Sequence, residues 1–212
     1  MPTFDAAFAD LPLVAILRGL DPDQAVETGE ALVAAGFRLI EVPLNSPRPL
    51  LSIRRLADAL AGRALIGAGT VLRRREVGEV AHAGGRLIVS PNMDPAVIHA
   101  AKEAGLVSLP GAMTPSEIFA AINAGADAIK LFPGELIPPN AVAALRAVVP
   151  KSARLLPVGG VGGSNMAAYR AAGADGFGLG SSLYKPSFPI SETAARARAL
   201  ALAWRTARGE PA

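Results

Sequence analysis

The chain of 212 residues contains no cysteine and only two histidines, His82 and His99. The absence of cysteine excludes a disulfide scaffold, a thiol nucleophile and any cysteine-ligated zinc or iron–sulfur site. Both histidines fall in predicted helices, where we expect them at the surface rather than in a metal centre. No apolar run reaches the ~20 residues of a membrane span, because glycine, proline and charged residues interrupt each one. We therefore expect a cytoplasmic protein with no membrane partner.

Lysine is also scarce. Only four of the 21 basic residues are lysines, namely Lys102, Lys130, Lys151 and Lys185. The arginines are spread along the chain, the net charge is only +3, and the run Arg73-Arg74-Arg75 is typical of a solvated helix face. We therefore predict no nucleic-acid partner. A reaction that needs an amine nucleophile has few candidates in this chain.

Short apolar runs recur along the chain, and each ends in Gly, Pro, Asn, Ser or Thr. None alternates between apolar and polar residues, which is typical of strands that are buried on both faces in a parallel sheet. The runs are Leu13–Gly19, Leu39–Asn45, Leu65–Thr70, Arg86–Pro91, Leu106–Gly111, Ala128–Gly134, Leu155–Gly160 and Gly176–Ser181.

Alanine-rich amphipathic segments lie between these runs. Several begin with a capping residue before proline, as at Asp94-Pro95, and several end in Ala-Gly, as at Ala35-Gly36. These residues favour helix starts and helix ends, respectively. The repeat predicts an α/β fold, a (β/α)8 TIM barrel that forms a single domain over residues 1–212, with a short leading helix within residues 1–12. An open doubly wound sheet is the alternative, but no G-x-G-x-x-G motif follows the first run.

The C-terminal ends of barrel strands carry the chemistry of such enzymes, and this rule singles out Lys130. It lies inside the apolar stretch Ala128–Phe132. Burying an unpaired ammonium group is costly, so such a lysine usually has either an ion-pair partner or a depressed pKa. A depressed pKa makes the amine a nucleophile at neutral pH, whereas a structural ion pair is the alternative interpretation.

Glu41 is the acidic residue embedded in a predicted strand. In a barrel interior it can act as a general acid or base, ligate a metal, or neutralise Arg18 at the end of the first run. Together, Arg18, Glu41 and Lys130 would give one cavity two cations and one anion, which suits an anionic substrate and favours a neutral amine. Glu135 is the only second carboxylate that we expect nearby, so we predict no metal and no cofactor.

Glycines end the last two runs, at Gly159-Gly160 and at Gly180-Ser181. Bare backbone N–H groups before a helix form anion sites, and phosphate sites after strands seven and eight are common in TIM barrels. We therefore predict a phosphate site, with simple turns as the alternative. Four further strand-end residues are candidates for substrate contact, namely Asn45, Thr70, Pro110 and Phe132. Phe132 could instead pack in the core, and Thr70 could instead cap a helix.

Together these segments resemble the KDPG/KHG aldolases. The resemblance runs from about Leu11 to Arg205, in the same order, and is highly specific as a set. It rests on Val14–Gly19, Ile40–Asn45, Ile66–Val71, Ile129–Pro133, Val158–Val161 and Gly178–Ser181.

The resemblance implies a class I aldolase on a (β/α)8 barrel, assembled as a homotrimer and independent of metal. Its substrate would be a phosphorylated 2-keto-3-deoxy sugar acid, cleaved to pyruvate and D-glyceraldehyde 3-phosphate. It also implies that Lys130 forms the Schiff base and that Glu41 shuttles protons.

The resemblance assigns binding roles as well. Arg18 and Thr70 would contact the substrate near its carboxylate. Gly159, Gly160 and Ser181 would hold its phosphate.

Within the family, two segments favour different branches. Glu41–Pro47 is similar to the galactonate branch, whereas the gluconate branch more often has Thr and Arg where this chain has Pro43 and Asn45. Pro110–Pro115 is instead similar to the gluconate branch. We expect 2-dehydro-3-deoxy-6-phosphogalactonate as the substrate, with the gluconate epimer as the alternative.

Two interpretations from other classes stay open at this point. One is a sugar-phosphate isomerase or epimerase, which would need no imine on Lys130 and would release no pyruvate. The other is a non-catalytic sugar-phosphate-binding protein. The cost of burying Lys130 and Glu41 without a use for them argues against the second.

Overall fold

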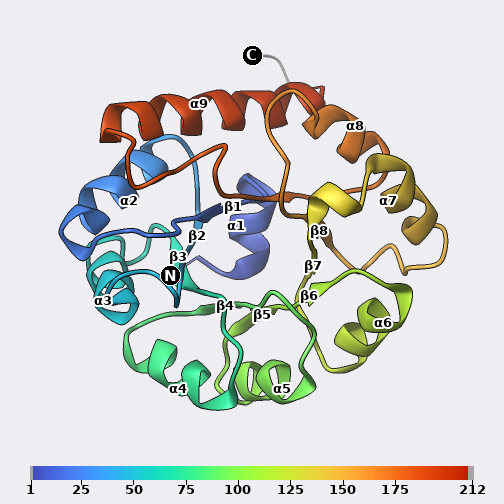
Figure 1. Cartoon of the computed structure of the whole chain (residues 1–212), viewed down its shortest axis with the longest axis horizontal. Helices are drawn as coiled ribbons and strands as arrows, with labels where there is room; N and C mark the ends of the chain where they lie inside the picture. The colour runs from blue at the N-terminus through green and yellow to red at the C-terminus, as the bar shows by residue number, and fades with distance from the viewer. Residues whose placement is uncertain (1, 210–212) are drawn as a thin grey trace.

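The computed structural model describes residues 2–209, in which helices surround a curled arrangement of parallel strands (Figure 1). The strands are β1 Leu13–Ile16, β2 Leu39–Pro43, β3 Leu65–Gly69, β4 Leu87–Val89, β5 Val107–Leu109, β6 Gly111–Ala112, β7 Ile129–Leu131, β8 Leu155–Pro157 and β9 Phe177–Leu179. The helices are α1 Phe4–Asp10, α2 Ala25–Ala34, α3 Pro49–Ala59, α4 Arg74–His82, α5 Pro95–Glu103, α6 Pro115–Asn123, α7 Pro139–Arg146, α8 Met166–Ala171 and α9 Ile190–Ala207, with 3-10 turns η1 Pro22–Gln24 and η2 Gly134–Leu136.

The strands form two parallel sheets. Six strands pair in the order β5-β4-β3-β2-β1-β9, and three pair in the order β6-β7-β8. The predicted fifth strand is divided at Pro110, which has no N–H to donate to a neighbouring strand. The α/β class with parallel strands is confirmed, whereas this pairing gives a curled sheet of six strands rather than a continuous ring of eight.

Two copies of the sequence Ala-Gly-Ala-Asp join these sheets at both of their edges. The Asp127 carboxylate accepts a hydrogen bond from Ser108 N at 2.8 Å, which ties the start of β7 to the start of β5. The Asp175 carboxylate accepts one from Leu155 N at 2.8 Å, which ties the start of β9 to the start of β8. A single bridge between Val158 and Gly178 extends the second junction.

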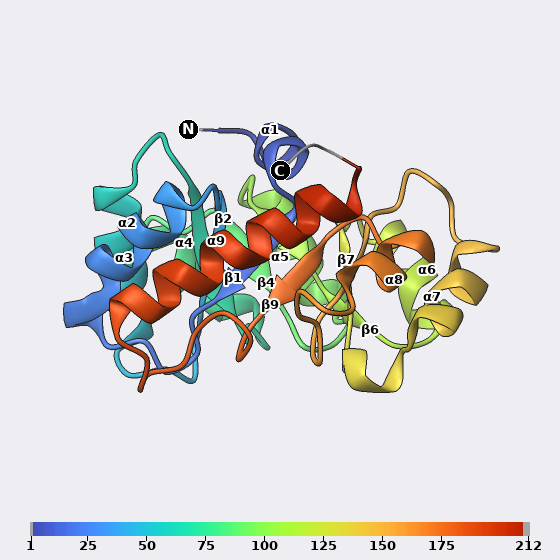
Figure 2. The ribbon, with the colours of Figure 1, turned by 90° about the horizontal axis from the view of Figure 1, so that it is seen from above.

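Helix α1 covers one end of the strands, as Figure 2 shows. Its Phe4 and Ala7 join an inner apolar cluster that includes Leu39 of β2, Ala128 and Leu156. The leading helix is therefore confirmed, although Met1 lies outside the described residues. With α1 packed at the N-terminal ends of the strands, the opposite end is left for polar groups.

The predicted helix signals act as caps. Asp94 accepts a hydrogen bond from Ala96 N, and Thr114 forms a capping box with Glu117 at the start of α6. Thr114 is thus the helix cap that its position before Pro115 predicts. No helix among the described residues is both long and apolar enough to cross a bilayer.

Candidate active site

Strand periodicity places Glu41 and Lys130 on the inner face of the two curled sheets. Side chains two residues apart on a strand point to the same face. Leu39 and Ala128 belong to the inner cluster, so Glu41 and Lys130 follow them on the same face, one step nearer the C-terminal ends of β2 and β7. Glu41 is 2% exposed and Lys130 is 7% exposed. Both charges are therefore built into the interior.

Burial shifts both groups toward their neutral forms. It raises the pKa of the Glu41 carboxyl to about 7, against the opposing effects of Lys130 and Arg18. It also lowers the pKa of the Lys130 amine, which Glu41 opposes and Arg18 assists. Each residue is thus close enough to act electrostatically on the other. A carboxyl group and an amine that titrate toward neutral pH are suited to proton transfer and nucleophilic attack.

The Glu41 carboxylate has an oxygen without a hydrogen-bond partner, and the neighbouring strand leaves room for it. Its Oε2 is buried without a hydrogen-bond partner among the described residues. A side chain at Gly69, at the end of the neighbouring strand β3, would collide with this carboxylate. Glycine at position 69 therefore makes room for Glu41, a requirement that a sequence pattern alone does not reveal.

Arg18 and Asn45 meet at the same end of the strands. The Arg18 guanidinium donates a hydrogen bond to Asn45 Oδ1 at 2.9 Å, and both side chains are exposed. Thr70 follows β3 with a φ of +56°, an uncommon backbone conformation for a residue other than glycine. These three predicted residues thus lie at the ends of the adjacent strands β1, β2 and β3.

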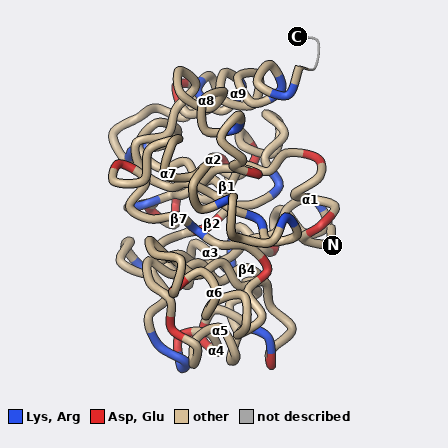
Figure 3. The backbone as a smooth tube through the Cα atoms, turned by 90° about the vertical axis from the view of Figure 1, so that its right-hand side faces the viewer, with Lys and Arg blue, Asp and Glu red and all other residues tan. Residues whose placement is uncertain are grey.

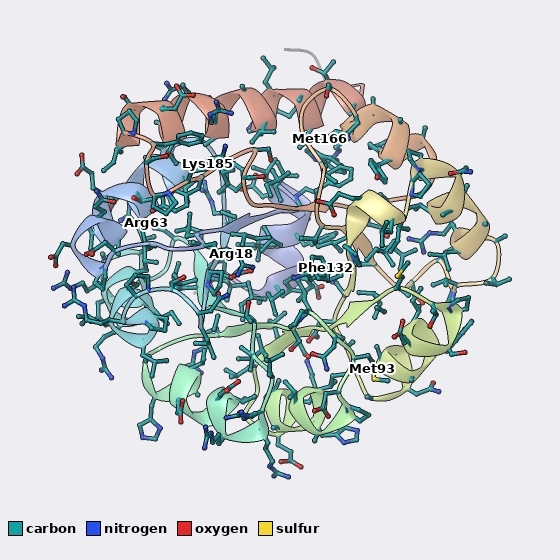
Figure 4. All side chains as sticks on the ribbon, viewed as in Figure 1. Arg18, Arg63, Met93, Phe132, Met166 and Lys185 are labelled. Atoms are coloured by element: carbon teal, nitrogen blue, oxygen red, sulfur yellow. The ribbon has the colours of Figure 1, made fainter. Side chains whose placement is uncertain are left out.

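Phe132 contacts the candidate nucleophile. The Nζ of Lys130 lies 4.5 Å from the centroid of its ring. In Figure 4, Arg18 and Phe132 lie near the middle of the view. Phe132 is half-buried, so it borders the interior site rather than filling the outer core. Pro110 is buried beside Lys130, and its carbonyl accepts a hydrogen bond from Lys130 N at 2.9 Å.

The two glycine-containing ends lie on neighbouring strands, β8 and β9. Gly159 and Gly160 have φ values of +107° and +66°, which favour glycine. Asn165 accepts a hydrogen bond from Gly162 N and donates one to Gly160 O, which holds the turn. Open space surrounds Gly180, and Ser181 beside it is exposed.

Glu135 lies over the first of these turns rather than beside Glu41. A side chain at Gly159 would collide with the Glu135 carboxylate. The described residues contain no group of three or more histidine, cysteine or acidic side chains that is arranged to hold a metal. Sequence reasoning treated Glu135 as a second candidate metal ligand and missed its position at the glycine turn.

The remaining lysines and the histidines lie elsewhere. Lys102 pairs with Asp127, with 2.6 Å between Nζ and Oδ2. Lys151 and Lys185 are exposed, and so are His82 and His99. Lys130 is therefore the buried lysine of the described chain.

Comparison with known protein families identifies the family of this chain. The family model for KDPG and KHG aldolase matches residues 4–198. The chain belongs to this family. It is therefore an aldolase, and aldolases are lyases, so the family suggested by the sequence motifs is confirmed.

Close relatives carry more specific names. A probable 2-dehydro-3-deoxy-6-phosphogalactonate aldolase of Rhizobium meliloti is 46% identical over 93% of each chain. The 2-dehydro-3-deoxy-6-phosphogalactonate aldolase of Escherichia coli is 44% identical over 93% of this chain and 96% of the relative. A solved structure described as native KDPGal superimposes with a TM-score of 0.92 at 44% identity, covering 94% of this aldolase and 97% of that chain.

Proposed function

We propose that this aldolase cleaves 2-dehydro-3-deoxy-6-phosphogalactonate to pyruvate and D-glyceraldehyde 3-phosphate through a Schiff base on Lys130. The observation that carries the proposal is the buried Lys130 amine, whose pKa is lowered by burial and which interacts electrostatically with the buried Glu41 carboxyl. Relatives named as 2-dehydro-3-deoxy-6-phosphogalactonate aldolases support the choice of substrate.

The neutral Lys130 amine attacks the C2 ketone of the substrate and forms a carbinolamine. Loss of water gives an iminium ion, which accepts the electron pair of the C3–C4 bond when that bond breaks. The C4 hydroxyl loses its proton and becomes the aldehyde of glyceraldehyde 3-phosphate. The remaining enamine is protonated at C3, and hydrolysis of the iminium returns the Lys130 amine and releases pyruvate.

Glu41 moves the protons of this sequence. Its pKa of about 7 lets the same carboxyl donate a proton during loss of water and accept one from the C4 hydroxyl. Its partnerless Oε2 is an acceptor for a substrate hydroxyl or a bridging water.

Binding groups at opposite sides of the site hold the ends of the substrate. Arg18, positioned by Asn45, meets the carboxylate together with Thr70. Phe132 and Pro110 border the reacting carbons. The phosphate is held by the strand-end groups of Gly159, Gly160, Gly180 and Ser181. Fixing both ends places C2 against Lys130, and such positioning supplies much of the rate.

We also propose that the two sheets act as one closed eight-stranded barrel in a single domain. The hydrogen bonds of Asp127 and Asp175 support closure at the two edges, as does the bridge from Val158 to Gly178. A core cluster that extends from Leu11 to Trp204 supports the single domain. The homotrimer and the cytoplasmic location stay predictions, and light scattering tests the first.

Borohydride trapping tests the Schiff base. The protein is incubated with pyruvate, reduced with sodium borohydride, digested and mapped by mass spectrometry. We expect a reduced pyruvate adduct on the peptide that contains Lys130 and none in the Lys130→Ala variant. An unmodified, folded wild-type protein would overturn the imine mechanism.

A rate comparison tests the substrate. The galactonate and gluconate epimers are assayed side by side for pyruvate release, and a higher kcat/KM is expected for the galactonate epimer. A preference for the gluconate epimer would move the assignment to the other branch, which Pro110–Pro115 resembles.

A further inference from the structure

A second cavity lies at the end of the strands opposite Lys130 and Glu41. It has a volume of about 570 Å³ and is bordered by α1, by the loops that precede β8 and β9, and by the end of α9. Figure 2 shows α1 and the end of α9 at this same end of the molecule. A volume of this size is typical of small-molecule sites.

Four of the residues that line this cavity are basic. Lys151, Arg154, Arg170 and Arg208 line the cavity, whereas Asp175 is its acidic lining residue. Asp175 is already occupied, because its carboxylate accepts from Arg146 at 2.5 Å and from Leu155 N at 2.8 Å. Figure 3 marks basic positions at the C-terminal end of α9, and basic and acidic positions beside α1. Basic side chains therefore outnumber acidic ones around the cavity.

Aromatic rings hold two of the arginines in place. The Arg170 guanidinium lies 5.7 Å from the Trp204 ring. The Arg154 guanidinium lies 5.1 Å from the Phe4 ring and 4.9 Å from the Phe8 ring. Stacking orients a guanidinium without consuming its N–H donors. One Arg154 nitrogen donates to Asp5 at 2.7 Å, and a guanidinium has five such donors.

Trp204 lines the cavity and is itself almost fully buried. The residue is 4% exposed, and its Nε1 has no hydrogen-bond partner among the described residues. The indole therefore borders the cavity as an aromatic surface, while its N–H stays inside the core.

We propose that this cavity is a second anion site, distinct from the aldolase site, which binds a small organic phosphate. Oriented arginines favour phosphate because their planar N–H groups match its oxygens in pairs. The spread of basic groups over a metabolite-sized cavity fits a ligand with more than one anionic group better than a single chloride or sulfate ion.

Trp204 makes the proposal directly measurable, because it is the only tryptophan in the chain. The wild-type protein is titrated with inorganic pyrophosphate at low ionic strength while its tryptophan fluorescence is recorded. Sodium chloride at the same ionic strength is the blank. We expect a saturable change with pyrophosphate only.

Two variants test the wall. Lys151→Ala removes an exposed loop charge, and Arg170→Ala removes the guanidinium that stacks on Trp204. Each should raise the dissociation constant for pyrophosphate about tenfold, in line with the loss of one charge-assisted contact. Arg86→Ala is the matched control, because Arg86 is an exposed arginine before β4 that does not line the cavity. It should bind as the wild type does.

The same two variants separate this site from the phosphate contacts proposed for the aldolase site, because Lys151 and Arg170 line the cavity at the opposite end of the strands. Both variants should release pyruvate at the rate of the wild type. A wild-type response that does not exceed the chloride blank would overturn the proposal. So would equal binding by Lys151→Ala, Arg170→Ala and Arg86→Ala.

Discussion

Two kinds of buried or half-buried charge occur in this molecule, at opposite ends of the same strands. At the N-terminal ends, Asp127 is bonded to Lys102 and to Ser108 N, and Asp175 is bonded to Arg146 and to Leu155 N. Toward the C-terminal ends, Glu41 keeps an oxygen without a partner. The first arrangement joins strands, whereas the second holds a reactive group.

The difference teaches how to separate structural charges from chemical ones. A carboxylate that accepts from both a cation and a backbone N–H uses its oxygens to hold the fold together. Glu41 and Lys130 are instead buried more completely than they are paired, so burial pushes both toward neutrality. The active-site charges therefore differ from the structural ones because they are buried without a full set of hydrogen-bond partners.

Lys130→Ala should have the largest effect. Without the amine no imine forms, and we expect turnover to fall by at least about 10⁴-fold. Lys102→Ala is the matched control, because Lys102 belongs to the structural group, and it should keep most of the activity. Pyruvate release measures the activity of both variants, and circular dichroism shows whether they are folded. Comparable activity in both variants would contradict a catalytic role for Lys130.

Glu41→Gln should slow turnover by about 10²–10⁴-fold, the usual contribution of general acid–base catalysis. Because the pKa of Glu41 is about 7, the rate of the wild type should rise with pH through that value as the carboxyl becomes a base. The variant should lose this rise while still trapping pyruvate. An unchanged pH profile would leave Glu41 as a charge partner only.

The same residue predicts a pH effect on stability. Folding raises the pKa of Glu41 from 4.5 to about 7, so the folded protein retains a proton that the unfolded chain has released between these values. The contribution of Glu41 to the free energy of unfolding therefore falls as pH rises from 4.5 to 7. Glu41→Gln should gain stability relative to wild type above pH 7, by on the order of 3 kcal/mol at most. Urea unfolding at pH 5 and pH 8 measures it.

Gly69→Ala should displace the Glu41 carboxylate with which the new methyl group collides. We expect kcat to fall by about 10-fold to 100-fold, because small misplacements of a catalytic group are costly. Gly78→Ala on α4 is the control, since open space surrounds it. It should leave kcat unchanged and add about 0.5–1 kcal/mol of stability through better helix propensity. Equal kinetics in both variants would mean that Glu41 needs no such space.

Asp175→Asn should reduce stability more than activity. It weakens the charge-assisted bond to Arg146 at the junction between β8 and β9, and we expect a loss of about 1–3 kcal/mol. Urea unfolding measures the loss, with pyruvate release as the second readout. A large fall in kcat with unchanged stability would mean that Asp175 takes part in the reaction, as Glu41 and Lys130 do.

Much of this architecture can be predicted from local sequence. Apolar runs without alternation predict buried parallel strands, and capping residues predict helix starts that the structure confirms at Asp94 and Thr114. The role of Pro110 was harder to predict, because a proline within an apolar run can end a strand or divide it. The structure shows the second outcome.

The sequence by itself determined which residues are unusual. A lysine and a glutamate inside apolar strands are conspicuous because burying charge is expensive. Glycines at strand ends are conspicuous because their bare backbone N–H groups can bind an anion. Only the tertiary structure decided which groups meet. Strand register pairs Glu41 with Gly67, and its carboxylate then lies against Gly69 two residues further along β3. Folding places Glu135 over Gly159, and the helix ends bring distant arginines around Trp204. These contacts join residues far apart in the chain, so no local pattern specifies them.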